Sequence, residues 1–182
     1  MVAASNHFDQ NLFLVGPMGV GKTTIGRLLA QELGLRFIDS DHEIEKRAGA
    51  NISWIFDVEG EAGFRERESI VIDDLTQRKG VLIATGGGSV LSPQNRQCLV
   101  SRGVVVFLDT SLELQLKRTE KDKKRPLLQN VDHTIVLKNL KEVRDPIYQE
   151  VSDLKVFVGE DGSRKIVNAI VKKLKDEALL KE

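Results

Sequence analysis

The sequence predicts an α/β fold in a single domain of 182 residues, with a five-stranded parallel sheet flanked by helices. Short apolar runs alternate with segments of helical periodicity, a pattern typical of a parallel sheet that helices cover on both faces. A glycine-rich phosphate-binding loop joins the first apolar run to the first helix. The composition, 41% hydrophobic and 30% charged, is that of an ordinary globular domain with a full core.

The five predicted strands are mostly apolar, with Lys155 as an exception in the last, which favours strands buried on both faces. They cover residues 12–15, 37–38, 81–84, 104–108 and 154–158. The first helix is expected over residues 24–33. The last is expected over residues 164–174, where apolar side chains recur at a helical period and should pack against the sheet.

The first strand leads into Gly16-Pro17-Met18-Gly19-Val20-Gly21-Lys22-Thr23, which satisfies the P-loop pattern G-x-x-x-x-G-K-[ST] in full. Glycines let backbone N–H groups surround phosphate oxygens, the lysine adds a mobile charge, and the threonine hydroxyl can bind Mg²⁺. A chance glycine-rich turn is the alternative, but the position between a strand and a helix argues against it. The predicted nucleotide-binding residues are Gly16, Gly19, Val20, Gly21, Lys22, Thr23 and Thr24.

Two segments are additional to the simple alternation of strands and helices. A long helical region runs from Asp39 to about Arg78, between the second and third strands. A charged stretch runs from Thr119 to about Asn130 and includes Glu120-Lys121-Asp122-Lys123-Lys124-Arg125. This stretch suits a mobile lid, although a solvated loop explains a charge run equally well.

A pair of carboxylates, Asp39 and Asp41, follows the second strand. If the chain stays extended there, side chains two residues apart point to one side, so both face the crevice at the carboxyl ends of the strands. One could then hold Mg²⁺ while the other orients or deprotonates an attacking hydroxyl. Alternatively, Asp41 only caps a helix that begins near His42.

A second glycine cluster, Gly86-Gly87-Gly88, follows the third strand and could bring backbone N–H groups close to a ligand. Arginine suits bidentate binding of carboxylates and phosphates, and Arg65, Arg125 and Arg144 are candidates. No periodicity distinguishes these arginines from surface salt-bridge residues.

Whole-chain properties exclude several classes of function. The 27 basic and 27 acidic residues give zero net charge, which argues against binding nucleic acid or an anionic membrane through a general positive field. No apolar run approaches the ~20 residues of a membrane span, and the polar start does not suit a signal peptide, so we expect a cytoplasmic protein. The single cysteine, Cys98, allows no intrachain disulfide.

These residues resemble the shikimate kinase family over nearly the whole chain, from Asn11 to about Ile170. The P-loop alone indicates only a superfamily, whereas six separated motifs in order are specific. They are Gly16 to Thr23, Asp39-Ser40-Asp41, Gly60-Glu61-Ala62-Gly63-Phe64-Arg65, Gly86-Gly87-Gly88, Arg125-Pro126-Leu127-Leu128 and Arg144-Asp145-Pro146-Ile147-Tyr148.

The resemblance implies a nucleoside-monophosphate-kinase arrangement with a shikimate-binding segment at about residues 40–68 and a lid at about 119–130. It implies ATP and Mg²⁺ as cofactors, shikimate as the acceptor, a role in aromatic amino-acid biosynthesis, and a monomer.

The resemblance also implies residue roles. Asp41 contacts the shikimate hydroxyls as the candidate base, and Asp39 reaches the metal through water. Arg65 and Arg144, with the Gly87 backbone, hold the carboxylate. The remaining implied roles are lid closure onto the transferring phosphate by Arg125, adenine contact by Arg118, orientation of Arg65 by Glu68, and pocket walls formed by Phe56 and Phe64.

Two other functions stay open at this point. One is another small-metabolite kinase of similar fold, acting on gluconate or a nucleotide. The other is a nucleotide-dependent switch that binds a partner protein, although no Asn-Lys-x-Asp guanine motif is present.

Overall fold

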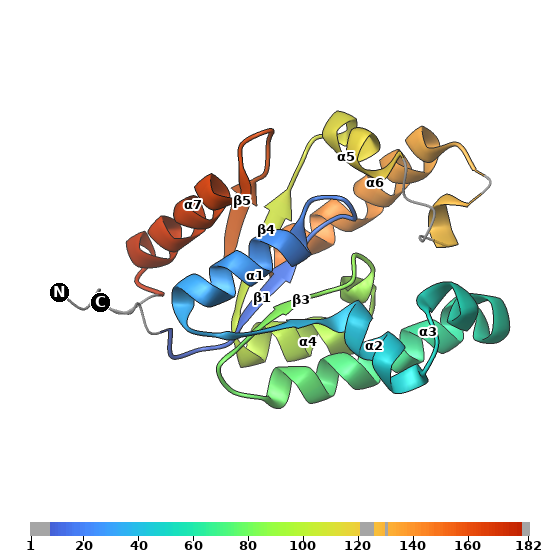
Figure 1. The fold of residues 1–182 in the computed structure, drawn as a ribbon, viewed down its shortest axis with the longest axis horizontal. Coiled ribbons are helices and arrows are strands. Elements are labelled where there is room, and N and C mark those ends of the chain that lie inside the picture. Colours follow the sequence, from blue (N-terminus) through green and yellow to red (C-terminus); the bar gives the residue numbers. More distant parts are fainter. Residues whose placement is uncertain (1–7, 121–125, 130, 180–182) are drawn as a thin grey trace.

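A computed structural model describes residues 8–120, 126–129 and 131–179. Within these residues, parallel strands form one five-stranded sheet in the order β2-β3-β1-β4-β5 (Figure 1). This arrangement confirms the predicted fold class. The strands are β1 (Leu12–Val15), β2 (Arg36–Asp39), β3 (Val81–Ala84), β4 (Val104–Asp109) and β5 (Leu154–Phe157).

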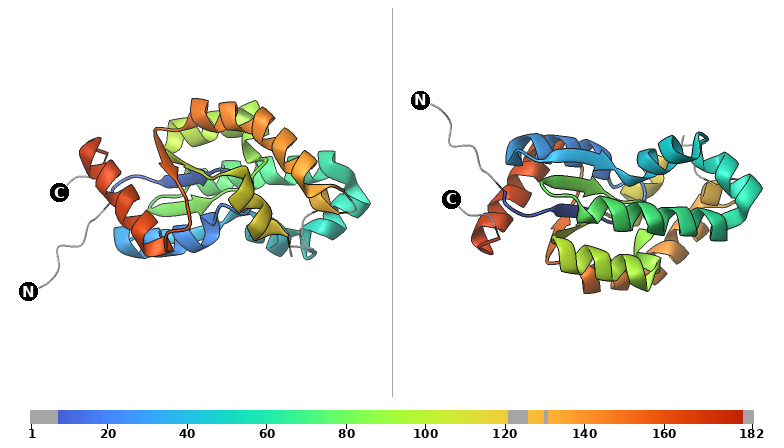
Figure 2. Two further views of the ribbon diagram at one scale, coloured as in Figure 1. Left: turned by 90° about the horizontal axis from the view of Figure 1, so that it is seen from above. Right: turned by 90° about the horizontal axis from the view of Figure 1, so that it is seen from below.

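Helices cover both faces of the sheet (Figure 2). Helices α1 (Lys22–Leu33) and α7 (Ser163–Asp176) lie on one face. The other face carries α3 (Ile52–Gln77), α4 (Pro93–Arg102) and α6 (His133–Val151). The shorter elements are α2 (Ser40–Ala48), α5 (Leu112–Thr119) and the 3₁₀ turns η1 (Ser89–Leu91) and η2 (Pro126–Leu128). Among the described helices, none is long and apolar enough to cross a membrane.

Strand alternation divides the buried side chains between the two faces. Leu12 and Leu14 of β1 join the cluster under α1 and α7, whereas Phe13 and Val15 join the cluster under α3, α4 and α6. β1 and β3 are buried along their whole length. The expectation that every strand is buried on both faces is wrong at the sheet edges. In edge strand β5, Leu154 and Val156 join the cluster under α1 and α7, whereas Lys155 and Phe157 on the opposite face join no apolar cluster and stay exposed.

Helix α3 is interrupted at Gly60, which has φ 70° and ψ 178°. A residue with a side chain is strained in this region of backbone space, so the interruption depends on glycine. The segment is therefore two helices that meet at a bend. Phe56 precedes the bend and Phe64 follows it, and their ring centroids are 4.8 Å apart.

The topology brings three chemistry-bearing segments to one edge of the sheet. The P-loop follows β1, Asp39 ends β2, and Gly86 lies two residues after β3. Strands β2, β3 and β1 are adjacent and parallel, so their carboxyl ends meet. A ligand site in a sheet of this kind is expected at that edge.

Candidate functional site

Three glycines of the P-loop, Gly16, Gly19 and Gly21, have positive φ angles. Gly21 caps the start of α1 in a left-handed conformation, with φ 100°. At Gly16, which has φ 145°, a Cβ atom would lie 2.3 Å from the carbonyl oxygen of Leu108, so no other residue fits. Lys22 Nζ donates to the carbonyl oxygens of Gly16 and Pro17 at 2.7 and 2.9 Å. The loop therefore carries its lysine charge beside the N-terminus of α1, where helix geometry also favours an anion.

Asp39 connects the P-loop helix to the end of β2. Its Oδ2 accepts from Thr23 Oγ1 at 2.7 Å, and its Oδ1 accepts from the backbone N–H groups of Asp41 and His42. Asp39 is thus the N-cap of α2, which begins at Ser40. The prediction that the chain stays extended through Asp41 is wrong, and so is the alternative that Asp41 is the cap. Asp41 lies in the first turn of α2 and still lines the pocket.

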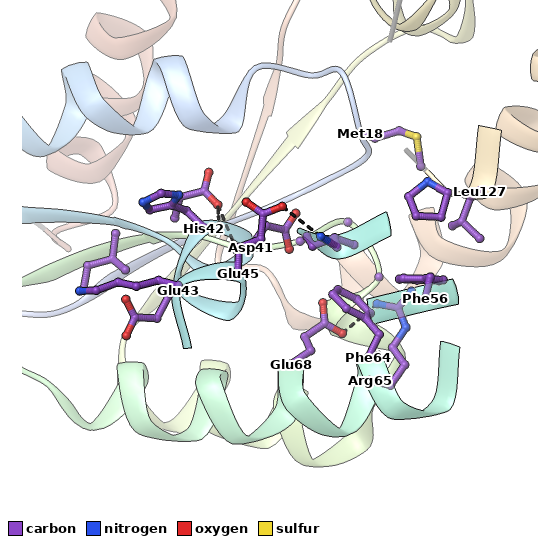
Figure 3. A pocket seen from close by; sticks show the side chains of 18 of the residues that line it. Met18, Asp41, His42, Glu43, Glu45, Phe56, Phe64, Arg65, Glu68 and Leu127 are labelled. Atoms are coloured by element: carbon purple, nitrogen blue, oxygen red, sulfur yellow. Dashed lines mark hydrogen bonds and ion pairs between the residues drawn. The ribbon is translucent and has the colours of Figure 1, made fainter. Parts of the chain in front are cut away.

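One pocket of about 780 Å³ opens beside the P-loop at this edge of the sheet. Figure 3 shows Met18 and Leu127 near one end and His42 and Glu43 near the other. The predicted site residues that line it are Asp39, Asp41, Phe56, Phe64, Arg65, Gly86, Gly87, Gly88 and Arg144, with Glu68 beside them.

Two carboxylates, those of Asp41 and Glu68, approach the same backbone position in the pocket. A Cβ atom on Gly86 would lie 2.6 Å from Asp41 Oδ1 and 2.9 Å from Glu68 Oε1. The N–H of Gly86 donates to Ser40 Oγ at 3.0 Å, which ties the glycine cluster to the start of α2. The absence of a side chain at Gly86 therefore leaves room for both carboxylates.

Arg65 and Glu68 form a partly buried ion pair, drawn dashed in Figure 3, with Nη1 2.8 Å from Oε2; Glu68 is the buried partner. Desolvation raises the pKa of Glu68 to about 7 despite the opposing charge of Arg65. The nearby Asp41 also raises it, and Arg144 lowers it. Because the pKa in the folded state lies above its ordinary value of 4.5, the contribution of Glu68 to stability decreases as pH rises from 4.5 through about 7.

Arg65 is further fixed by its surroundings. Its Nη2 contacts Glu61 Oε1 at 3.3 Å, and its Cζ lies 5.2 Å from the centroid of the Phe64 ring. Although burial alone would lower the pKa of Arg65, the neighbouring carboxylates raise it, so the guanidinium stays charged. Arg144 enters from α6 and is only 5% exposed. The pocket thus presents two guanidinium groups beside an aromatic wall.

Two arginines predicted to contact the nucleotide, Arg118 and Arg125, are not among the described residues that line this pocket. Arg118 donates to the carbonyl oxygens of Gly159 at 2.8 Å and Val20 at 3.3 Å, so it links α5 to the P-loop and to the loop after β5. Arg125 lies outside the described residues. Next to it, Pro126 and Leu127 line the pocket.

Several residues that shape the site lie within the motifs quoted above, but no role of their own was predicted for them from the sequence. Ser40 accepts from Gly86, and Tyr148 donates its hydroxyl to the carbonyl oxygen of Gly87. Met18 and Leu127 add apolar lining. Tyr148 had one available signal: it lies four residues after Arg144 in a helix, so the two side chains share a face.

Comparisons with known proteins agree on one family. The family model described as shikimate kinase matches residues 18–175. A shikimate kinase from Vibrio parahaemolyticus is 56% identical over 167 residues, which cover 92% of this chain and 97% of the relative. A shikimate kinase from Buchnera aphidicola subsp. Schizaphis graminum is 54% identical over 163 residues, covering 89% of this chain and 94% of the relative.

Solved structures give the same result. A shikimate kinase from Acinetobacter baumannii, solved in complex with shikimate, superposes with a TM-score of 0.91 at 48% identity. The match covers 92% of this chain and 94% of that one. The shikimate kinase from Aquifex aeolicus has a TM-score of 0.81 at 39% identity, covering 93% of this chain and 98% of its own.

Proposed function

The chain belongs to the shikimate kinase family, and from this we propose that it transfers the γ-phosphoryl group of ATP to the 3-hydroxyl of shikimate, giving shikimate 3-phosphate and ADP. The observation that carries the proposal is the lining of one pocket beside the P-loop. That lining combines a carboxylate, Asp41, with two arginines, Arg65 and Arg144, and three backbone glycines.

The arginines suit an acceptor that bears a carboxylate. Arg65 and Arg144 reach the pocket from α3 and α6, so they can grip one carboxylate from two sides. Phe56 and Phe64 give the pocket an apolar wall against which a carbon ring can lie. Gluconate and nucleoside monophosphates are also anionic acceptors, but neither presents a compact ring that carries both a carboxylate and hydroxyl groups.

We assign the proton transfer to Asp41. The acceptor oxygen attacks the γ-phosphorus, the bond from that phosphorus to the β–γ bridging oxygen breaks, and the hydroxyl proton passes to the Asp41 carboxylate. Lys22 neutralises charge that builds up on the outer phosphates. Asp41 is suited to this role because it lines the pocket at the end of the sheet where the P-loop lies.

The donor set beside the P-loop fits Mg²⁺. Thr23 Oγ1 and the Asp39 carboxylate are hard oxygen donors, already 2.7 Å apart. We propose that Thr23 binds the ion directly and that Asp39 reaches it through water, with the nucleotide phosphates supplying further oxygens. A bound Mg²⁺ would neutralise phosphate charge at this position.

Two segments complete the proposal. We propose that residues 40–68 are the shikimate-binding segment and that the predicted lid at residues 119–130, part of which lies outside the described residues, brings Arg125 to the transferring phosphate. Arg118 lies against adenine, which its position between the P-loop and the loop after β5 supports. We further propose that the protein is cytoplasmic and acts as a monomer; in support of a monomer, the proposed acceptor-binding residues that line the pocket all come from one chain.

An acceptor-specificity assay tests the function. The purified protein with ATP and Mg²⁺ is given shikimate, gluconate or nucleoside monophosphates, and ADP release is followed by a coupled assay. We expect turnover on shikimate and little on the other acceptors. Turnover on gluconate or a nucleotide without turnover on shikimate would overturn the proposal, and ADP release that no acceptor stimulates would favour a binding switch.

A further inference from the structure

The only tyrosine in the chain, Tyr148, is buried beside the acceptor pocket. It is 1% exposed, and its ring centroid lies 5.1 Å from that of Phe107 in β4. Its hydroxyl donates to the carbonyl oxygen of Gly87. Burial raises the pKa of this phenol above its ordinary value, so the group remains a donor at working pH. A phenylalanine would fill the same space, so the hydroxyl adds only its polar contacts: the hydrogen bond to Gly87 and an interaction with the Arg144 side chain.

Helix α6 directs two groups at one backbone position. Arg144 and Tyr148 are four residues apart and so lie on the same helix face. Arg144 Nη1 is 3.6 Å from the point where a Cβ atom on Gly87 would lie. The same point is 3.5 Å from the backbone nitrogen of Met18 in the P-loop. Gly87 is therefore enclosed between α6 and the P-loop, with its carbonyl group held by Tyr148.

The Gly87–Gly88 peptide is planar and trans, so its C=O and N–H groups point in opposite directions. Tyr148 holds the C=O on the buried side. Among the described residues, no protein acceptor takes the N–H of Gly88. Gly88 lines the pocket, and the position for its Cβ is only 2.3 Å from Arg65 Nη2. A donor without a protein acceptor therefore lies next to the guanidinium groups.

We propose that Tyr148 is a positioning residue for the acceptor carboxylate: by holding the Gly87 carbonyl, it fixes the Gly87 backbone and turns the Gly87–Gly88 peptide so that the Gly88 N–H joins Arg65, Arg144 and the Gly87 backbone in the grip. This inference rests on the proposed function. It assigns to α6 two contributions to one ligand group, a direct charge from Arg144 and an indirect orientation from Tyr148.

The Tyr148→Phe variant tests the role kinetically. Without the hydroxyl, the peptide can turn away and must be turned back when the ligand binds. We expect the KM for shikimate to rise about twofold to tenfold, the equivalent of one neutral hydrogen bond, with kcat and the KM for ATP close to those of the parent. The methyl ester of shikimate lacks the negative charge, so its KM should rise less than that of the acid. The variant should therefore prefer the acid over the ester less strongly than the parent does.

A packing variant and a spectroscopic signal distinguish an effect on the position of the Gly87–Gly88 peptide from a general loss of packing around Tyr148. Phe107→Leu removes the ring contact but keeps the hydroxyl, and it should lower the melting temperature without changing the acid-to-ester preference. In protein labelled with ¹³C at the tyrosine ζ carbon, the single signal should shift when shikimate binds and shift less with the ester. This measurement on the parent decides the matter even if Tyr148→Phe does not fold.

Each outcome decides one point. An unchanged acid-to-ester preference in Tyr148→Phe, or a ζ-carbon signal that shikimate does not move, would overturn the positioning role while turnover of shikimate by the parent leaves the proposed function intact. Failure of the parent to phosphorylate shikimate would overturn the proposed function and, with it, this inference.

Discussion

Replacing Gly88 by alanine should weaken shikimate binding while the fold persists. The glycine has φ −95° and ψ 1°, which alanine can adopt, so the effect is steric. A Cβ atom there would lie 2.3, 2.5 and 2.6 Å from Nη2, Nη1 and Cζ of Arg65. Ordinary contacts begin at 3.4 Å, so the guanidinium must move by about 1 Å.

The displacement should cost binding far more than stability. Arg65 is a long side chain whose end can move, so we expect the free energy of unfolding to fall by less than ~1 kcal/mol. A guanidinium displaced by that distance loses a charge-assisted hydrogen bond to the substrate, worth ~1.5 to 3 kcal/mol. The KM for shikimate should therefore rise about 10-fold to 150-fold, with the KM for ATP nearly unchanged.

The assay is ADP release at varied shikimate, with a thermal melt of each variant. Gly162→Ala is the matched control, because Gly162 has φ −64° and a Cβ atom there would meet nothing within 4 Å. In an Arg65→Ala background, Gly88→Ala should add little, since the group it displaces is gone. A parent-like KM in Gly88→Ala, or a full additional penalty without Arg65, would refute the reasoning.

Three further predictions concern the charged groups of the site. Lys22→Ala should lower kcat by ~10²-fold or more with the fold intact, because the outer phosphates lose their cation; parent turnover would contradict the P-loop assignment. Asp41→Asn should lower kcat ~10²- to 10⁴-fold at unchanged ATP affinity, whereas Asp39→Asn should mainly shift the Mg²⁺ dependence. Identical responses to Mg²⁺ in these two variants would argue against separate roles. In the parent, the free energy of unfolding should fall by up to ~3 kcal/mol as pH rises from 4.5 through about 7, and in Glu68→Gln this fall should be absent; denaturant titration at several pH values measures both. If the variant keeps the pH dependence of the parent, Glu68 is not the group responsible for it.

The sheet could be predicted because its signals are local. Residues 12–15 and 81–84 are apolar throughout and match β1 and β3 in full. The first helix begins at Lys22, two residues before the predicted start, because a helix start after a glycine-rich loop depends on backbone dihedrals that the sequence does not specify. The bend at Gly60 was not predicted, since one glycine in a helical pattern is often tolerated.

Most of the residues predicted on the acceptor side line one pocket, and the expected pairing of Glu68 with Arg65 is present, but other connections within the site were not predicted. Asp39 and Asp41 both line the pocket, but the sequence does not show which of two good capping residues starts α2. The hydrogen bonds from Gly86 to Ser40 and from Tyr148 to Gly87 join residues 46 and 61 positions apart. Such long-range pairs arise only from the assembled fold. The role of Arg125 stays a prediction, because that residue lies outside the described part of the chain.

The bend at Gly60 constrains how this scaffold could change its choice of acceptor. Phe56 and Phe64 face each other across a junction whose backbone conformation only glycine adopts without strain, so the angle between the two half-helices is fixed by one residue. Directed evolution toward a bulkier acceptor therefore has little freedom to open the wall by re-angling the helices. It should instead proceed through side-chain volume at Phe56 and Phe64, where smaller residues enlarge the pocket and the bend is retained.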